Sequence, residues 1–247
     1  HQDGHSHLLA STVPNCVSYD PCYAYELAVI VQDGLRRMVA EKQSVFYYIT
    51  VMNESYVQPP MPEGAEQDIL SGMYHLRTLP GDDAKRVRLL GSGTILREVE
   101  AAAETLNADY GITVDVFSVT SFNELARDGQ DVVRWNTLHP EETAKVSFVA
   151  RQLPGDAPVI AASDYVKSLA EQIRGHIAAP YQVLGTDGFG RSDTREALRG
   201  FFEVDRRFVT LAALKSLADA QKLPVEQVRS ARDALGIDPD KPNPRLV

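Results

Sequence analysis

The pattern of apolar positions divides the chain into short strands and amphipathic helices. Residues 24–39 carry apolar side chains at intervals of three and four, which is the spacing of one helical face. Asp20 and Pro21 precede this stripe and predict a helix that begins there, with Asp20 as its N-cap. Residues 45–51 are β-branched and aromatic without alternation, which predicts a strand buried on both faces.

The composition changes between Asn53 and Gly64, where prolines gather among polar residues. Proline fixes φ and removes a hydrogen-bond donor, so this stretch predicts an extended linker. We therefore divide the chain into residues 1–61, the end of one α/β domain with its linker, and residues 62–247, a second domain. A short helix around residues 65–73 is expected to open the second domain.

Beyond the linker, apolar strand patterns alternate with helical patterns. The expected strands cover residues 86–90, 113–119, 145–149, 158–162 and 181–184. The expected helices cover residues 94–106, 121–127, 164–176, 193–202, 205–220 and 224–235, before an irregular tail. Ser121 and Glu124 form a capping-box pattern, and Asp164 is expected to cap the next helix. This alternation predicts an α/β fold, a mostly parallel sheet with helices on both faces.

Charge and composition exclude several classes of protein. The net charge is −9 and there is no run of Lys and Arg, which argues against nucleic-acid binding. No apolar run approaches the roughly 18 residues that cross a bilayer, and no signal-peptide pattern is present. Cys16 and Cys22 lack a matching Cys or His pair for zinc. They predict buried thiols in a cytoplasmic protein.

Residues 1–7, His-Gln-Asp-Gly-His-Ser-His, concentrate the titratable chemistry of the chain. Gly4 lets the backbone turn, and imidazoles suit proton transfer or metal binding near neutral pH. A solvated terminus, the remnant of a tag and an adventitious metal site are the alternative interpretations. Because the chain starts in a polar loop without Met, we expect a piece of a longer protein, whose upstream part is missing or lies on another chain.

Two glycine-rich turns and three isolated histidines are weaker candidates. Residues 91–94 follow a strand and precede a helix, where backbone N–H groups can bind an anion, but they lack the third glycine and the lysine of nucleotide-binding loops. A tight turn is the simpler interpretation there, and a strand exit is the simpler one for residues 185–190. His75, His139 and His176 are interpreted as structural or solvated. A Ser-His-Asp triad stays open, although no nucleophile elbow is present.

Several segments together resemble the transketolase superfamily, and within it the large homodimeric decarboxylating components of bacterial pyruvate dehydrogenase complexes. Residues 1–7 are similar to that family's His-Glu-Asp-Gly-His-Ser-His loop, with Gln2 in place of an acidic residue. Residues 19–21 and 45–51 resemble the end of its pyrimidine-binding α/β domain. Further landmarks resemble its transketolase-like C-terminal domain, namely residues 89–93, 118–125, 185–193 and 243–246.

The resemblance implies a thiamine diphosphate-dependent oxidoreductase between glycolysis and acetyl-CoA synthesis. Such an enzyme decarboxylates pyruvate and reductively acetylates the lipoyl domain of a dihydrolipoyl acetyltransferase. The resemblance implies His1 as the active-site histidine by alignment with the family. His7 is second, at the position of a substrate-contacting histidine of the superfamily, and His5 is a weaker third.

The resemblance also implies a cytoplasmic homodimer whose thiamine diphosphate and Mg²⁺ are bound mainly by residues upstream of His1. The Gly-Asp-Gly motif of the diphosphate site does not occur in the sequence. We therefore assign no cofactor-binding or metal-binding residue and expect the chain alone to be inactive.

Two alternatives remain at this stage. One is transketolase-type ketol transfer, whose loop has Gly-Pro-Thr-His where residues 4–7 are Gly-His-Ser-His. The other is a non-catalytic α/β interaction domain that uses the C-terminal fold alone.

Overall fold

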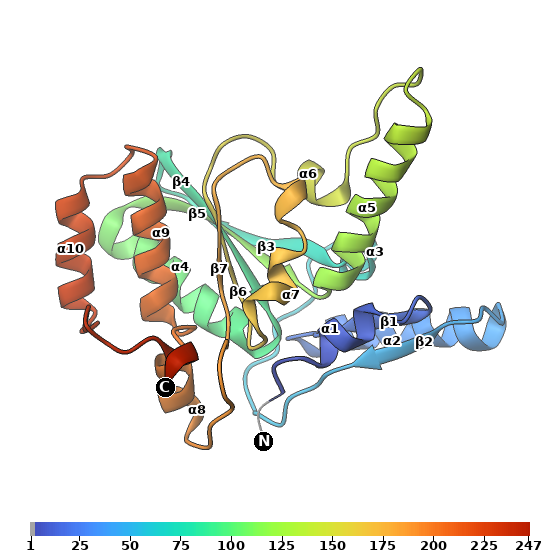
Figure 1. The fold of residues 1–247 in the computed structure, drawn as a ribbon, viewed down its shortest axis with the longest axis horizontal. Coiled ribbons are helices and arrows are strands. Elements are labelled where there is room, and N and C mark those ends of the chain that lie inside the picture. Colours follow the sequence, from blue (N-terminus) through green and yellow to red (C-terminus); the bar gives the residue numbers. More distant parts are fainter. Residues whose placement is uncertain (1–2) are drawn as a thin grey trace.

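The computed structural model describes residues 3–247, and its larger sheet has five strands in the order β3-β5-β4-β6-β7 (Figure 1). The strands are β3 (Met73–Leu79), β4 (Asp82–Ser92), β5 (Ile112–Val119), β6 (Val159–Ala162) and β7 (Tyr181–Leu184). All neighbours pair in parallel except β3, which runs antiparallel to β5. The prediction that four of these strands share one mostly parallel sheet is therefore confirmed.

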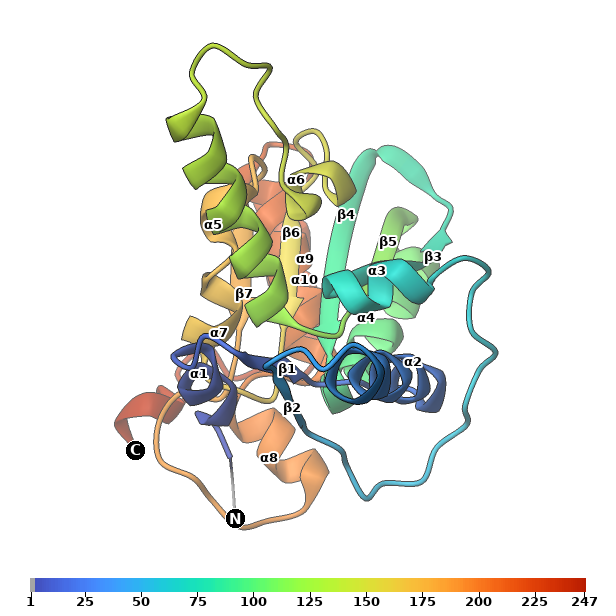
Figure 2. The ribbon, with the colours of Figure 1, turned by 90° about the vertical axis from the view of Figure 1, so that its right-hand side faces the viewer.

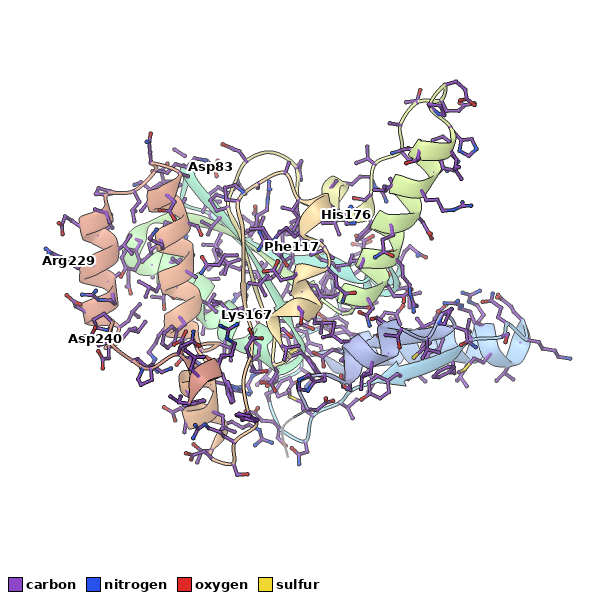
Figure 3. The ribbon with its side chains drawn as sticks, in the orientation of Figure 1. Asp83, Phe117, Lys167, His176, Arg229 and Asp240 are labelled. Carbon is purple, nitrogen blue, oxygen red and sulfur yellow. The ribbon has the colours of Figure 1, made fainter. Side chains whose placement is uncertain are left out.

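Helices cover both faces of the large sheet (Figure 1). On one face lie α4 (Leu96–Tyr110), α8 (Arg195–Phe201), α9 (Arg206–Asp219) and α10 (Val225–Ala234). On the other lie α5 (Phe122–Leu138), α6 (Phe148–Gln152) and α7 (Lys167–Glu171). Side chains fill the layers between them: Phe117 is buried in the middle, whereas Arg229 and Asp240 lie at the periphery (Figure 3).

The N-terminal segment forms a second, two-stranded parallel sheet below the large one (Figures 1 and 2). It contains α1 (Ser6–Ser11), β1 (Cys16–Tyr19), α2 (Ala24–Leu35), a π-helical turn (Arg36–Ala40) and β2 (Phe46–Ile49). Residues 50–62 form no helix or strand, as expected for a linker, and lead to α3 (Glu66–Ser71). The division at residues 61 and 62 stays a prediction, and His1 lies outside the described residues.

Two expectations for the N-terminal segment were wrong. The strand β2 is not buried on both faces: Phe46 is 46% exposed, because β2 pairs only with β1 among the described residues. Asp20 does not cap α2, which begins at Ala24. The carboxylate of Glu26 accepts the N–H groups of Cys22 and Tyr23 at this end instead. An apolar run does not specify its partners, and a capping pattern competes with tertiary contacts.

Further corrections concern the large domain. The antiparallel strand β3 was not predicted, and residues 145–149 enter α6 rather than a strand, with the Ser147 hydroxyl as its cap. Asp164 does not cap a helix, because its backbone and that of Tyr165 bind Thr186 at the exit of β7. The expected helix over residues 164–176 is therefore divided into α7 and a 3₁₀ turn (Arg174–His176).

Other sequence predictions are confirmed. Ser121 caps α5, since its hydroxyl accepts the N–H of Glu124 at 3.0 Å, although α5 is longer than expected. Cys16 and Cys22 are free and buried. Residues 91–94 form a tight turn, in which a Cβ on Gly91 would lie 2.6 Å from the Cα of Leu96.

Within residues 3–247, no helix combines the length and the apolar character that crossing a membrane requires.

Candidate functional site

The N-terminal segment meets the large sheet at the carboxyl ends of its parallel strands, the edge where open α/β sheets bind ligands (Figure 2). The backbone of Asp20 joins two of these ends: its N–H donates to Thr120 O at 2.8 Å, and its carbonyl accepts from Gly93 N at 3.1 Å. The side chain of Asn123, at the start of α5, donates to the carbonyl of His7 at 2.8 Å. These contacts fix the histidine loop on the sheet.

The histidine loop, defined here as residues 3–7, is ordered by its aspartate and its glycine. Asp3 accepts the N–H groups of His5 and Ser6 at 3.2 and 3.0 Å. Burial raises the pKa of Asp3, but the hydrogen bonds from Ser6 and His5 outweigh it, so the pKa lies below its usual value. The carbonyl of Gly4 accepts from the N–H of Val166 at 3.1 Å, which ties the loop to the segment after β6.

His7 is the candidate histidine that the structure buries. It is 3% exposed, and its ring lies edge-on against Tyr165 and Tyr48, with centroids 4.7 and 5.4 Å away. Its Nε2 lies 2.9 Å from the hydroxyl of Thr50. Burial lowers the pKa of His7 to about 4 although Asp3 opposes the shift, so the ring is neutral at neutral pH.

The other two candidate histidines are placed differently. The side chain of His5 is exposed at the surface of the histidine loop. His1 lies outside the described residues, so its position relative to His7 stays a prediction.

Asp20 continues the network of His7 toward the sheet. Its Oδ1 accepts from Thr50 Oγ1 at 2.7 Å and its Oδ2 from Ser92 Oγ at 3.0 Å. Gly93 has a φ of +50°, and a Cβ there would collide with the Asp20 carboxylate, so the glycine turn is shaped around this group. Burial raises the pKa of Asp20 to about 7 against the two hydroxyl donors, and nearby carboxyl groups add to the rise.

A second buried carboxylate lies in the first turn of α2. Glu26 has no exposed surface, and its Oε2 accepts the N–H groups of Cys22 and Tyr23 at 2.5 and 2.9 Å. Its Oε1 accepts from the hydroxyls of Tyr74 and Ser118 at 2.7 and 2.6 Å. Burial raises the pKa of Glu26 despite these four donors. The residue therefore joins α2 to β3 and β5.

We expect Asp20→Asn to change how stability depends on pH. Folding raises the pKa of Asp20 from 3.8 to about 7, so the folded chain holds this proton more tightly than the unfolded chain. The stabilisation from protonated Asp20 is complete below pH 3.8 and lost as the pH rises through about 7. As the pH rises through this window, the wild type should therefore lose free energy of unfolding relative to the variant. Urea unfolding at several pH values measures it, and a constant difference would contradict the assignment.

A large open pocket of about 1540 Å³ lies elsewhere, between the linker, α4, α8 and α9. Several of its charged side chains pair with one another: Arg97 with Glu54 at 2.7 Å, and Arg206 and Arg199 with Glu98 at 2.9 and 3.3 Å. Because these charges are mutually satisfied, we assign no ligand to this pocket.

Sequence reasoning missed most of the network around His7. Asp20 was noticed as a cap and Ser92 as part of a turn, and neither pattern indicates that the two side chains meet. Thr50 and Tyr165 carry no local signal. Their contacts with His7 follow from the way β2 and the exit of β6 approach α1.

Comparisons with known proteins place this geometry in a family. The model of the transketolase-like TK C-terminal domain matches residues 72–205, so the chain belongs to this family. Residues 1–59 match the middle domain of the pyruvate dehydrogenase E1 component. The curated relatives named pyruvate dehydrogenase E1 component include proteins from Pseudomonas aeruginosa, 60% identical over 99% of the chain, and Escherichia coli, 57% identical over 100% of it. The chain spans 28% of the length of each.

Solved structures with a similar fold are transketolases. A transketolase mutant from Pichia stipitis has a TM-score of 0.61 at 14% identity, and the match covers 90% of this chain and 28% of that one. The transketolase from Leishmania mexicana has a TM-score of 0.55 at 16% identity, with coverage of 91% and 28%. At these identities the likeness shows the fold alone. The resemblance inferred from the sequence is thus confirmed by the family models and the curated relatives.

Proposed function

We propose that the chain supplies the histidine loop and the C-terminal scaffold of a thiamine diphosphate-dependent pyruvate dehydrogenase. The observation that carries this proposal is the 60% identity over 99% of the chain to a relative named pyruvate dehydrogenase E1 component. The enzyme would decarboxylate pyruvate and acetylate the lipoyl domain of a dihydrolipoyl acetyltransferase. It would act as a cytoplasmic homodimer together with the upstream part of the same enzyme.

The described residues contribute a buried imidazole at the expected edge of the sheet. His7 is neutral at neutral pH and lies between two tyrosine rings, and a positioned neutral imidazole can accept a proton. We keep His1 as the proposed active-site histidine, His7 as the second and the exposed His5 as the weaker third.

The residues described here offer no ligand set for the Mg²⁺ that accompanies the cofactor. Thiamine diphosphate, when bound, would supply the electron sink for decarboxylation. Its Mg²⁺ needs several oxygen ligands, and within residues 3–247 no three His, Cys, Asp or Glu side chains are grouped to hold a metal ion. We therefore derive no step through the cofactor and propose that it is bound mainly by residues that this chain does not supply.

We expect the 247-residue chain alone to bind thiamine diphosphate with Mg²⁺ weakly or not at all. The physical reason is the lack of a ligand set among the described residues. Calorimetric titration of the chain measures this, with the natural polypeptide that carries this sequence as the positive control. A Mg²⁺-dependent site of micromolar or tighter affinity in the chain alone would show that the cofactor site was misplaced.

The function itself is tested on the natural polypeptide that carries this sequence. We expect pyruvate-dependent release of CO₂ and acetylation of a free lipoyl domain, followed by mass spectrometry of that domain. Ketol transfer between sugar phosphates without lipoyl acetylation would favour the transketolase alternative. Neither activity, in a folded protein loaded with cofactor, would favour a non-catalytic domain.

A further inference from the structure

Four side chains from four separate segments form a continuous chain of hydrogen bonds. His7 Nε2 lies 2.9 Å from Thr50 Oγ1, Thr50 Oγ1 lies 2.7 Å from Asp20 Oδ1, and Asp20 Oδ2 lies 3.0 Å from Ser92 Oγ. These hydrogen bonds connect four places in the fold: α1, the residue directly after β2, the residue directly after β1 and the last residue of β4.

The direction of these hydrogen bonds follows from counting protons. A threonine hydroxyl has one proton to donate and two lone pairs. The competing acceptors are Asp20 Oδ1 at 2.7 Å, the carbonyl of Tyr19 at 3.4 Å and the hydroxyl of Tyr165. Above the pH at which Asp20 ionises, its carboxylate is the strongest of these acceptors, so it takes the proton of Thr50. Thr50 can then only accept from His7, and Nε2 must be the ring nitrogen that carries hydrogen.

The remaining ring nitrogen of His7 is defined by the same count. A neutral imidazole has one N–H, so Nδ1 keeps an unshared electron pair. Within residues 3–247, the hydrogen bond of the His7 ring is the one between Nε2 and Thr50, and none occupies Nδ1. Tyr165 and Tyr48 hold the ring plane from two sides, with interplanar angles of 89° and 66°. The ring is therefore fixed both in orientation and in the placement of its proton.

We infer that Asp20, acting through Thr50, holds His7 as the tautomer with hydrogen on Nε2 and so makes Nδ1 the proton acceptor of this site. Asp20 and Thr50 are positioning residues, because they act through the imidazole. The glycine turn helps to hold Asp20 in place. Ser92 donates to Oδ2 of Asp20, and the lack of a side chain on Gly93 leaves room for the Asp20 carboxylate. The tautomer stands on this geometry, whereas its catalytic use rests on the proposed function.

The tautomer is measured by nitrogen NMR on the 247-residue chain with ¹⁵N-labelled histidine, above the pH at which Asp20 ionises. Loss of signals in His7→Gln assigns the two ring nitrogens. We expect the wild type to show a protonated Nε2 and an unprotonated Nδ1. Thr50→Val keeps the shape of threonine without its hydroxyl and should give a mixture of tautomers. Thr50→Ser restores the hydroxyl and should restore the wild-type spectrum.

Three outcomes overturn the inference: hydrogen on Nδ1 in the wild type, mixed tautomers in the wild type, or an unchanged spectrum in Thr50→Val. If Thr50→Val fails to fold, as judged by its melting curve, the wild type and Thr50→Ser still decide the tautomer.

The catalytic use is tested in the natural polypeptide that carries this sequence. Thr50→Val should lower turnover of pyruvate by about 10–100-fold, as expected when a partner that orients a reactive imidazole is lost, with KM nearly unchanged. Thr50→Ser should recover most of it. Equal turnover in wild type and Thr50→Val would overturn the catalytic use. A wild type without pyruvate activity, but with hydrogen on Nε2, would refute the proposed function and leave the tautomer standing.

Discussion

His1→Ala should lower the turnover of pyruvate by about 10²–10⁴-fold, the contribution that a positioned acid or base typically makes. The expectation rests on the similarity of residues 1–7 to a loop that faces the cofactor in the resembled family. A loop imidazole that only meets solvent should change turnover hardly at all and stability by no more than roughly 0.5 kcal/mol. Overall activity and the melting temperature of the natural polypeptide that carries this sequence are measured side by side.

His139→Ala serves as the matched control, because it removes an imidazole that stacks on Trp135 at the C-terminal end of α5, the end opposite Ser121. Activity of His1→Ala within about twofold of the wild type would make the loop structural and remove His1 from the site. A joint collapse of activity and melting temperature would make His1 part of the scaffold. The catalytic role would then pass to His7, whose burial and fixed ring already suit it.

The elements that could be predicted from the sequence are those whose burial is decided by local pattern. Central parallel strands are covered on both faces. Every position of β5 and the positions of β4 from Val87 onward are buried, and most of these residues are apolar, so the pattern could be recognised without knowledge of the neighbouring strands. Helix α4 could be predicted equally well, since Val99, Ala102 and Leu106 share one face with Ile95, the residue before the helix, and all four are buried. Amphipathic spacing and burial coincide there.

The elements that could not be predicted depend on what packs beside them. The sequence of β2 has the composition of a central strand, yet its exposure is set by the presence of a single neighbour, β1. The antiparallel edge strand β3 mixes exposed and buried positions and has a register shift between His75 and Arg77, so it lacks a clean period. The pattern of apolar and polar residues in a strand does not show how many strands pair with it.

The candidate site divides in the same way. A cluster of histidines is visible in the sequence, and the structure places His7 at the edge of the sheet. Its partners are not visible, because His7 and Thr50 are 43 positions apart and Thr50 and Asp20 are 30 apart. Only the folded backbone brings an ordinary threonine between an imidazole and a carboxylate.

Glu26→Ala should lower the free energy of unfolding by about 3–5 kcal/mol, because it removes the acceptor of four buried donors. Two of these donors are backbone N–H groups at the start of α2, and two are the hydroxyls of Tyr74 and Ser118. The substitution also leaves a cavity where α2 meets the large sheet, which adds to the cost. Chemical denaturation of the 247-residue chain measures the difference.

Glu26→Gln separates the loss of hydrogen bonds from the loss of volume. The amide oxygen can still accept the N–H groups of Cys22 and Tyr23, and the amide nitrogen then faces two hydroxyls that can turn to accept from it. We therefore expect this variant to cost about 1–2 kcal/mol. Glu63→Ala, at an exposed position of the linker, is the control and should stay within about 0.5 kcal/mol. If Glu26→Gln destabilises the chain as much as Glu26→Ala, the negative charge of Glu26 is itself required by its donors. If neither variant exceeds the control, Glu26 does not join the N-terminal segment to the sheet.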